Sequence, residues 1–257
     1  MPARHDLTED PGTLAELATV RLGTAFYRRA LDHVTDAGLD EPCRLPGWQR
    51  RHLVAHVGYN ARAVARLVTW AATGVQHPMY SSPQARAQEI DLGATLNPEA
   101  LRSLSEHAAI DLDVRWRDLP AERWSARVVT AQGRDVPVSE TVWMRTREVW
   151  LHAVDLDSGA RIDDVPRAVL ARLVGDVRRA WDQRGEPPVR LEVTDAPYGE
   201  PPLDGPDSPD GAAAAEVSVA GPLAALAAWV TGRLPAEQSK DVLVWTGGPP
   251  EAAPRWI

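Results

Sequence analysis

The chain is 257 residues long, which is enough to bury a substantial core and to divide into two domains. Hydrophobic residues make up 44% of it and charged residues 25%, the balance of an ordinary soluble globular protein. A formal net charge of −8 argues against a broad binding surface for nucleic acid or for an anionic membrane, because both are polyanions.

The first twenty residues and the cysteine content indicate where the protein works. MPARHDLTEDPGTLAELATV lacks the apolar core of a signal peptide, and no run of about eighteen apolar residues could cross a bilayer. Cys43 is the only cysteine, which excludes an internal disulfide and any metal site built from several cysteines. We therefore expect a cytoplasmic protein without a membrane segment.

Apolar residues recur at helical spacing in the first half of the chain. The pattern predicts helices at 14–37, from the LPGW turn to about 72, at 98–117 and at 139–157. Residues 74–97, which contain several Gly, Pro and Ser, are expected to form an irregular connection, and a loop this long is often functional. Four helices with one long crossover predict an antiparallel four-helix bundle.

The pattern changes after about residue 160, where helices alternate with short strands. A small α+β domain over 161–257 is therefore predicted to follow a helical domain over 1–160. Its expected elements are helices at 165–183 and 221–234, strands at 189–195, 213–220 and 241–247, and a Pro/Gly/Asp-rich loop at 196–211.

Two of the predicted helices carry polar groups on their apolar faces. In the second helix His56 lies within the apolar stripe and His52 lies at its edge. In the fourth helix His152 lies within the stripe and Glu148 at its edge. Such side chains must be hydrogen-bonded, ion-paired or bound to a metal, because burying them without a partner is costly.

Residues four apart share one face of a helix, so Glu148 and His152 can bind one ion while His56 reaches it from the facing helix. Two imidazoles and one carboxylate suit Zn²⁺ and leave a fourth position open, which is typical of catalytic zinc. The spacing leaves alternatives open. Glu148 and His152 could form a surface pair, His56 could be a hydrogen-bonded core histidine, and His52 could replace His56 or join it.

Other motifs give weaker indications. The sequence has no glycine-rich nucleotide motif, no GxSxG and no HExxH. Cys43 precedes the LPGW turn and is expected to be a packing residue rather than a nucleophile. Arg233, at the end of the helix predicted at 221–234, could bind an anion or could simply be a cation favoured near a helix C-terminus.

Taken together and in order, several motifs resemble one family, the mycothiol-dependent maleylpyruvate isomerases. These motifs are LPGW followed by seven residues and His56, WMRTREVWLHAVDL at 143–156, and GPLAALAAWVTGR at 221–233. PMYSSPQARAQEI, at 78–90, is similar to the same enzymes rather than only to their wider DinB-like superfamily. The resemblance spans nearly the whole chain.

The resemblance implies an N-terminal DinB-like four-helix bundle and a C-terminal α+β domain similar to sterol carrier proteins. It implies a zinc site made by three side chains, His56, Glu148 and His152. His52 then lies outside the ligand set. Arg233 would support catalysis from the second domain, and Asp155, which completes an ExxxHxxD pattern, would orient a ligand or the cofactor.

The activity implied is the cis–trans isomerisation of maleylpyruvate to fumarylpyruvate in gentisate-type degradation of aromatic compounds. Zinc would lower the pKa of bound mycothiol, and reversible addition of its thiolate would make the double bond rotatable. The expected partners are these two small molecules, without nucleic acid or membrane. A mycothiol S-transferase acting on another electrophile, a non-catalytic protein that binds a hydrophobic ligand, and a metallohydrolase remain alternatives.

Overall fold

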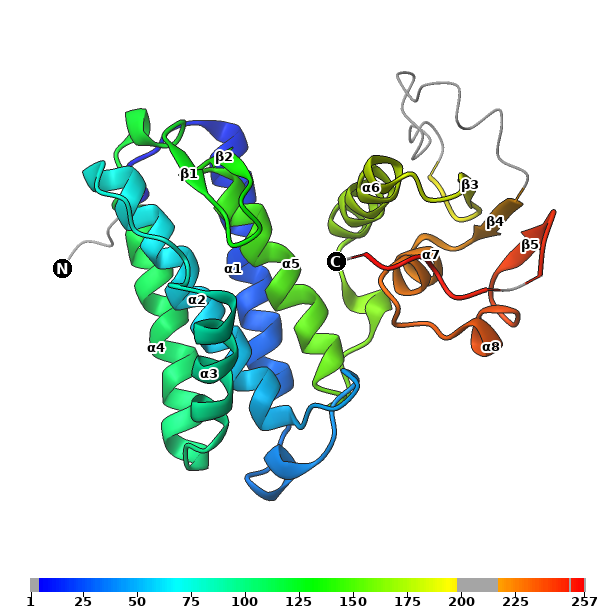
Figure 1. Ribbon diagram of the computed structural model, residues 1–257, viewed down its shortest axis with the longest axis horizontal. Helices are drawn as coiled ribbons and strands as arrows, with labels where there is room; N and C mark the ends of the chain where they lie inside the picture. Colours follow the sequence, from blue (N-terminus) through cyan, green and yellow to red (C-terminus); the bar gives the residue numbers. More distant parts are fainter. Residues whose placement is uncertain (1–4, 198–216, 250, 257) are drawn as a thin grey trace. The chain divides into compact units, whose positions relative to one another are not determined.

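The computed structural model of the chain describes residues 5–197, 217–249 and 251–256 (Figure 1). The chain divides into two compact units, Met1–Ala160 and Arg161–Ile257. The first unit is largely helical, and the second combines helices with a small sheet. This confirms the predicted order of a helical region followed by a smaller region that contains a sheet.

Helices account for most of the first unit. They are α1 (Pro11–Asp32), α2 (Arg50–Thr73), α3 (Pro83–Ala94), α4 (Pro98–Arg117) and α5 (Glu140–Asp155), with 3₁₀ turns at Ala37–Asp40 and Ala121–Arg123. Between α4 and α5 lies a short antiparallel hairpin of β1 (Arg127–Val129) and β2 (Asp135–Pro137).

Short polar side chains fix where several of these helices begin. The Asp10 carboxylate accepts a hydrogen bond from the N–H of Thr13 at 2.7 Å, and a proline follows Asp10 as the first residue of α1. Ser82 and Asn97, each also followed by proline, cap α3 and α4 in the same way. Helix α2 ends at Gly74, whose φ of +75° lies in the left-handed region that glycine adopts without strain.

Helix α2 lies at the centre of the first unit. It packs against α4, α3 and α5, while α1 packs along α5 (Figure 1). Its fully buried side chains include Leu53, Val57, Val64 and Leu67. Gly23 of α1 lies so close to α5 that an added Cβ would be 2.5 Å from the indole nitrogen of Trp150. The small side chain is therefore needed for α1 and α5 to approach each other.

The irregular connection predicted for residues 74–97 is wrong over Pro83–Ala94, which form α3. The segment contains too few apolar residues to show helical periodicity, and within it only Ile90, Gly93 and Ala94 are buried. The helix depends instead on its Ser82 cap and on close packing against α2.

The first helix is also shorter at its C-terminal end than predicted, because α1 ends at Asp32 rather than near residue 37. The Arg102 guanidinium of α4 donates hydrogen bonds to the carbonyl oxygens of Leu31 and Val34, which satisfies carbonyls at this helix end. The β1–β2 hairpin was not predicted, since strands of three residues are too short to show an alternating pattern.

The second unit contains α6 (Arg167–Arg184), β3 (Val189–Val193), β4 (Val217–Gly221), α7 (Leu223–Val230), α8 (Ala236–Ser239) and β5 (Val244–Thr246). Strand β4 is central in the sheet, parallel to β3 and antiparallel to β5. Helix α7 packs on α6, β3 and β4. The Trp229 ring lies edge-on to Trp181 and Trp245, with centroids 5.8 and 5.2 Å away, and joins the helices to the sheet.

Two sequence predictions for the second unit fall partly outside the described residues. The loop predicted at 196–211 lies outside them from residue 198 onward, as do the first residues of the strand predicted at 213–220. The remaining residues of that strand lie in β4.

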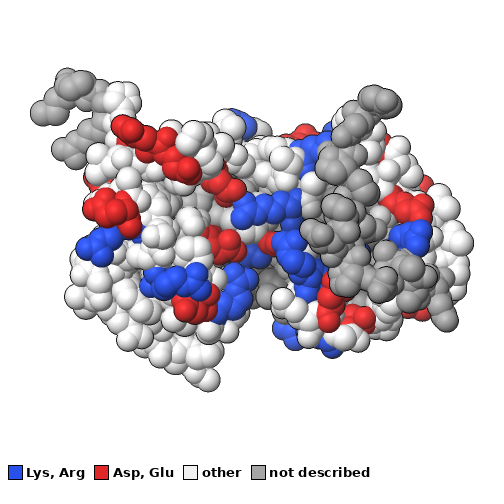
Figure 2. Space-filling view, turned by 90° about the horizontal axis from the view of Figure 1, so that it is seen from above, with Lys and Arg blue, Asp and Glu red and all other residues white. Residues whose placement is uncertain are grey.

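In the described parts of the chain, no helix has both the length and the apolar character needed to span a membrane. On the face of the first unit seen in Figure 2, acidic and basic side chains are interspersed. Charge on this face is therefore balanced locally rather than gathered into one patch.

Candidate metal centre

His56 of α2 and Glu148 and His152 of α5 converge in the first unit. Glu148 Oε2 lies 3.0 Å from His56 Nε2 and 3.1 Å from His152 Nε2. Each residue offers one ligand atom, and these atoms all lie within 4.8 Å of one another. We call these three residues the trio. No other group with this spacing occurs in the part of the chain that the structure describes.

The contacts within the trio set its charge states. Burial raises the pKa of Glu148, but His56 and His152 outweigh it and hold that pKa well below its usual value. Burial lowers the pKa of His152, but hydrogen bonds to Asp155 and Glu148 are stronger and raise it to about 9. Burial lowers the pKa of His56 despite the attraction of Glu148. A cation bound here would replace a proton of the trio, because metal ligands bind deprotonated.

Asp155 lies at the end of α5, three residues after His152, and is completely buried. Its Oδ2 accepts a hydrogen bond from His152 Nδ1 at 2.8 Å, while Nε2 of the same ring faces Glu148. A carboxylate on the second ring nitrogen fixes the tautomer and the orientation of a metal-binding histidine. The contact supports a positioning role for Asp155 through His152.

His52 lies outside the trio. Its Nδ1 accepts a hydrogen bond from the backbone N–H of Gln49 at 3.4 Å and forms part of the capping box that starts α2. His56 lies one turn further along α2 and faces α5. The spacing of the two histidines along the sequence could not distinguish these roles.

Arg145, which sequence reasoning missed, fixes α5 against α2 beside the trio. Its side chain is buried, and Nη1 donates hydrogen bonds to the carbonyl oxygen of Val57 at 2.8 Å and to Asn60 Oδ1 at 2.9 Å. Burial lowers the pKa of Arg145 to about 10, although the Glu148 charge favours the charged form. The available signal was its position three residues before Glu148, on the same helix face.

Arg86 and Tyr80 were also missed as site residues, although both lie in the motif at 78–90. Arg86 Nη2 lies 3.3 Å from His56 Nδ1. Burial raises the pKa of Tyr80, and the charge of Arg86 opposes that rise. Neither position could be inferred from spacing, because α3 was not predicted. The motif itself was the only signal.

Arg233 lies in the second unit, directly after α7. Its N–H donates to the carbonyl oxygen of Ala228 at 2.7 Å, and its Nη1 donates to that of Thr231 at 3.2 Å. It therefore satisfies carbonyls at the C-terminal end of α7. The catalytic role of Arg233 stays a prediction.

The Cys43 thiol is half-buried and directed at carbonyl oxygens, with Sγ 3.5 Å from that of Trp48. Burial raises the pKa of Cys43 above its ordinary value, so the thiol stays protonated near neutral pH. The structure therefore gives Cys43 no activation as a nucleophile.

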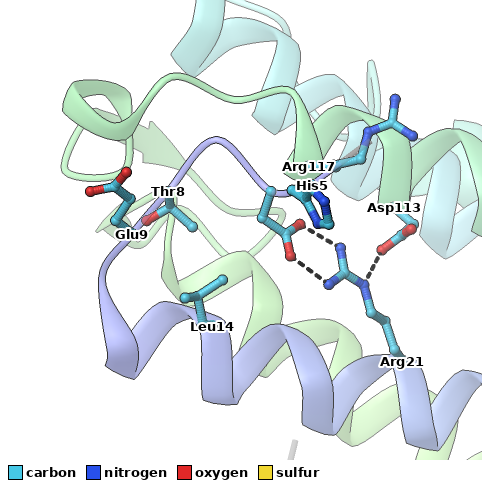
Figure 3. A pocket seen from close by; sticks show the side chains of 8 residues that line it. His5, Thr8, Glu9, Leu14, Arg21, Asp113 and Arg117 are labelled. Carbon is cyan, nitrogen blue, oxygen red and sulfur yellow. Dashed lines mark hydrogen bonds and ion pairs between the residues drawn. The ribbon is translucent and has the colours of Figure 1, made fainter. Parts of the chain in front are cut away.

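A cavity of about 640 Å³ lies elsewhere in the first unit (Figure 3). It is lined by His5, Asp6, Thr8, Glu9, Leu14, Arg21, Asp113 and Arg117. Arg21 pairs with Asp6 at 2.6 Å and with Asp113 at 2.7 Å, so the guanidinium of Arg21 is already held by two carboxylates. The trio does not line this cavity, and the candidate chemistry stays with the trio.

The chain resembles known proteins over most of its length. The family model for the mycothiol maleylpyruvate isomerase N-terminal domain matches residues 20–157. The crystal structure of the mycothiol-dependent maleylpyruvate isomerase is 42% identical, covers 95% of this chain and 97% of that chain, and superposes with a TM-score of 0.83. A histidine-to-alanine mutant of that isomerase matches at 41% identity with the same coverage and TM-score. Comparison with curated proteins gave no match.

A helical unit with a partly buried Glu–His–His cluster, followed by a small α+β unit, is thus the architecture of an isomerase enzyme. More specifically, the chain belongs to the mycothiol-dependent maleylpyruvate isomerase family. This confirms the resemblance predicted from the sequence.

Proposed function

We propose that this protein converts maleylpyruvate to fumarylpyruvate with mycothiol as the thiol cofactor and with a divalent metal held by the trio. The observation that carries the proposal is the convergence of three ligand atoms within 4.8 Å of one another in a chain of this family. The names of the structural relatives support the substrate and the cofactor.

The residues of the trio suit zinc. Two imidazole nitrogens and one carboxylate oxygen are ordinary zinc ligands, and three protein ligands leave room for a fourth. Asp155 supplies the supporting hydrogen bond that metal-binding histidines usually have. A zinc ion bound by the trio supplies Lewis acidity that lowers the pKa of a coordinated thiol.

The reaction requires rotation about a conjugated double bond, which is blocked while that bond keeps its double-bond character. Mycothiol, when bound, supplies a thiolate whose reversible addition leaves a rotatable single bond and whose expulsion restores the double bond. The protein orients the groups involved. Asp155 holds His152, Arg145 holds the α2 backbone next to His56, and we propose that Arg233 stabilises negative charge that develops on the substrate.

We also propose that α1, α2, α4 and α5 form a DinB-like four-helix bundle and that the second unit is related to sterol carrier proteins. The packing of α2 on α4 and α5, and of α1 on α5, supports the bundle. We propose that the two units are separate domains, with the boundary after Ala160, since each is compact. A cytoplasmic location and a role in gentisate-type degradation complete the proposal and rest on the sequence and the resemblance.

The test is to incubate the purified, zinc-loaded protein with maleylpyruvate, with and without mycothiol, and to follow fumarylpyruvate. We expect turnover only with mycothiol. His56→Ala, Glu148→Ala and His152→Ala should each lose metal and turnover together, while Arg233→Ala should keep its metal and lose turnover. Full activity of a metal-free His152→Ala variant would contradict the metal-based mechanism. A folded, zinc-loaded protein without turnover would favour a mycothiol S-transferase acting on another electrophile.

A further inference from the structure

Helix α3 places a guanidinium directly beside the trio. Arg86 Nη2 lies 3.3 Å from His56 Nδ1, on the side of the imidazole away from Glu148. The helix is held in this place by tight packing, because a Cβ added to Gly93 would lie 2.9 Å from the Ala55 Cβ of α2. Arg86 is therefore positioned by the fold and not by a flexible loop.

Arg86 differs from other arginines on this side of α2. Arg51 pairs with Asp40 at 2.5 Å, and Arg66 lies 3.4 Å from Glu89. Within the described residues Arg86 forms no ion pair. The half-buried guanidinium of Arg86 is directed at a histidine nitrogen, and its remaining N–H donors can bind an anion.

Tyr80 gives Arg86 a neighbour of suitable chemistry. Burial raises the pKa of Tyr80 although the nearby Arg86 charge lowers it, so the hydroxyl keeps its hydrogen and can donate to an acceptor. The negative charge of Glu148 also lies near enough to Tyr80 to raise the pKa of its hydroxyl. Two donors, a planar guanidinium and a hydroxyl, thus lie together beside the trio.

Metal binding is incompatible with the contact between Arg86 and His56. If Nε2 of neutral His56 binds a metal, Nδ1 carries the ring hydrogen and can only donate. A guanidinium also only donates, so the two groups cannot hydrogen-bond to each other in that state. The Arg86 guanidinium would then need another acceptor on the Nδ1 side of His56.

We propose that Arg86 and Tyr80 form a carboxylate-binding subsite in the first unit that receives a carboxylate of the electrophilic substrate. The inference rests on the proposed function and names the residues that bind its dianionic substrate. Arginine presents paired N–H donors that match the two oxygens of a carboxylate. The sugar and inositol parts of mycothiol carry hydroxyl groups instead of carboxylates, so the subsite discriminates in favour of the electrophile.

The test compares full-length, zinc-loaded wild type with Arg86→Gln, Arg86→Lys and Tyr80→Phe. The probe is maleate, with neutral dimethyl maleate as the comparison ligand, and binding is measured by calorimetry. We expect Arg86→Gln to weaken maleate binding at least about tenfold and Tyr80→Phe about threefold, since charge-assisted hydrogen bonds are the stronger ones. Arg86→Lys should recover part of the loss. Zinc content and dimethyl maleate binding should stay at wild-type values.

Arg28→Gln is the matched control, because Arg28 is a surface arginine of the same unit with its side chain 66% exposed. It should bind maleate as wild type does. Steady-state kinetics add an independent readout, and Arg86→Gln should raise KM for maleylpyruvate more than it lowers kcat.

Unchanged maleate affinity and unchanged KM in Arg86→Gln would overturn the subsite, and so would a failure of wild type to bind maleate. Loss of zinc from Arg86→Gln with maleate binding intact would also overturn it, because Arg86 would then only support His56. Failure of the proposed function is distinguishable. If the wild-type protein binds maleate through Arg86 but does not isomerise maleylpyruvate, the subsite is supported and the proposed function is contradicted.

Discussion

Replacing Asp155 tests how much its buried carboxylate contributes to metal binding. Asp155 is 0% exposed and accepts a hydrogen bond from His152 Nδ1 at 2.8 Å. Asp155→Asn keeps the shape and removes the charge, and Asp155→Ala removes the acceptor as well. Loss of such a partner usually costs about 10–100-fold in metal affinity, or about 1.4–2.8 kcal/mol. We expect about tenfold for Asp155→Asn and up to about 100-fold for Asp155→Ala.

The assay is competition for zinc between each purified protein and a chromophoric chelator at neutral pH. Circular dichroism and urea midpoints establish that each variant is folded, since Asp155 is buried and also contributes to stability. Asp157→Asn is the matched control, because its carboxylate lies two residues further on, is 54% exposed and pairs with Arg44 at 2.9 Å. Its zinc affinity should equal that of wild type.

If Asp155 acts only through His152, saturating zinc should restore turnover in the Asp155 variants. Zinc affinities equal to wild type in both folded variants would refute this reasoning. An equal loss of zinc affinity in Asp157→Asn would show that any change at the end of α5 disturbs the site. That result would contradict a specific role of the hydrogen bond between Asp155 and His152.

Three further changes test the fold around the site. Gly93→Ala should lower the free energy of unfolding by about 1–3 kcal/mol in urea denaturation, because its Cβ would lie 2.6 Å from a ring carbon of Tyr59. Arg145→Met should lower it by about 1–3 kcal/mol, since buried acceptors on α2 lose their charged donor. The hydrogen bond from Arg21 lowers the pKa of Asp6, so Asp6→Asn should cost up to about 1 kcal/mol at pH 7. That difference should begin to shrink below about pH 3.9, where the carboxyl of the unfolded chain takes up a proton, and should disappear once the native carboxyl is protonated as well.

Matched variants give the controls for these measurements. Gly175→Ala, in α6, should be neutral or stabilising, because its Cβ would meet only the mobile end of Arg179 at 3.4 Å. Asp135→Asn should have no measurable effect at either pH, since its ion pair with Arg127 is largely exposed. Gly93→Ala as stable as wild type would show that α3 shifts without cost. An Arg145→Met midpoint at or above that of wild type would show that its hydrogen bonds do not stabilise the packing.

Helices with a strong apolar period could be predicted from the sequence. Helices α2, α4 and α5 lie close to their predicted ranges, because buried aliphatic residues recur along them and Asn97 or Gly74 marks an end. The convergence of Glu148 and His152 follows from helical geometry alone, since residues four apart share a face. The choice of His56 over His52 does not follow from it, because it depends on how α2 is rotated against α5.

Features that depend on tertiary packing could not be predicted from the sequence. Helix α3 buries only one large aliphatic side chain, Ile90, besides Gly93 and Ala94, and its sequence therefore shows no apolar period. The proximity of Arg86 to His56 requires α3 to lie against α2, and that contact rests on a glycine, Gly93, rather than on a hydrophobic stripe. Sequence separation gives no hint of it, since the two residues are thirty positions apart.

One face of α5 serves both the core and the candidate chemistry. Arg145, Glu148, His152 and Asp155 follow at spacings of three, four and three, so they form one stripe along the helix. Arg145 anchors that stripe to the carbonyl of Val57, the residue after His56. We therefore expect a change that rotates α5 against α2 to alter stability and the geometry of the trio together. Arg86 reaches the same site from α3, so the proposed carboxylate subsite can be altered by substitution while the trio on α2 and α5 stays in place.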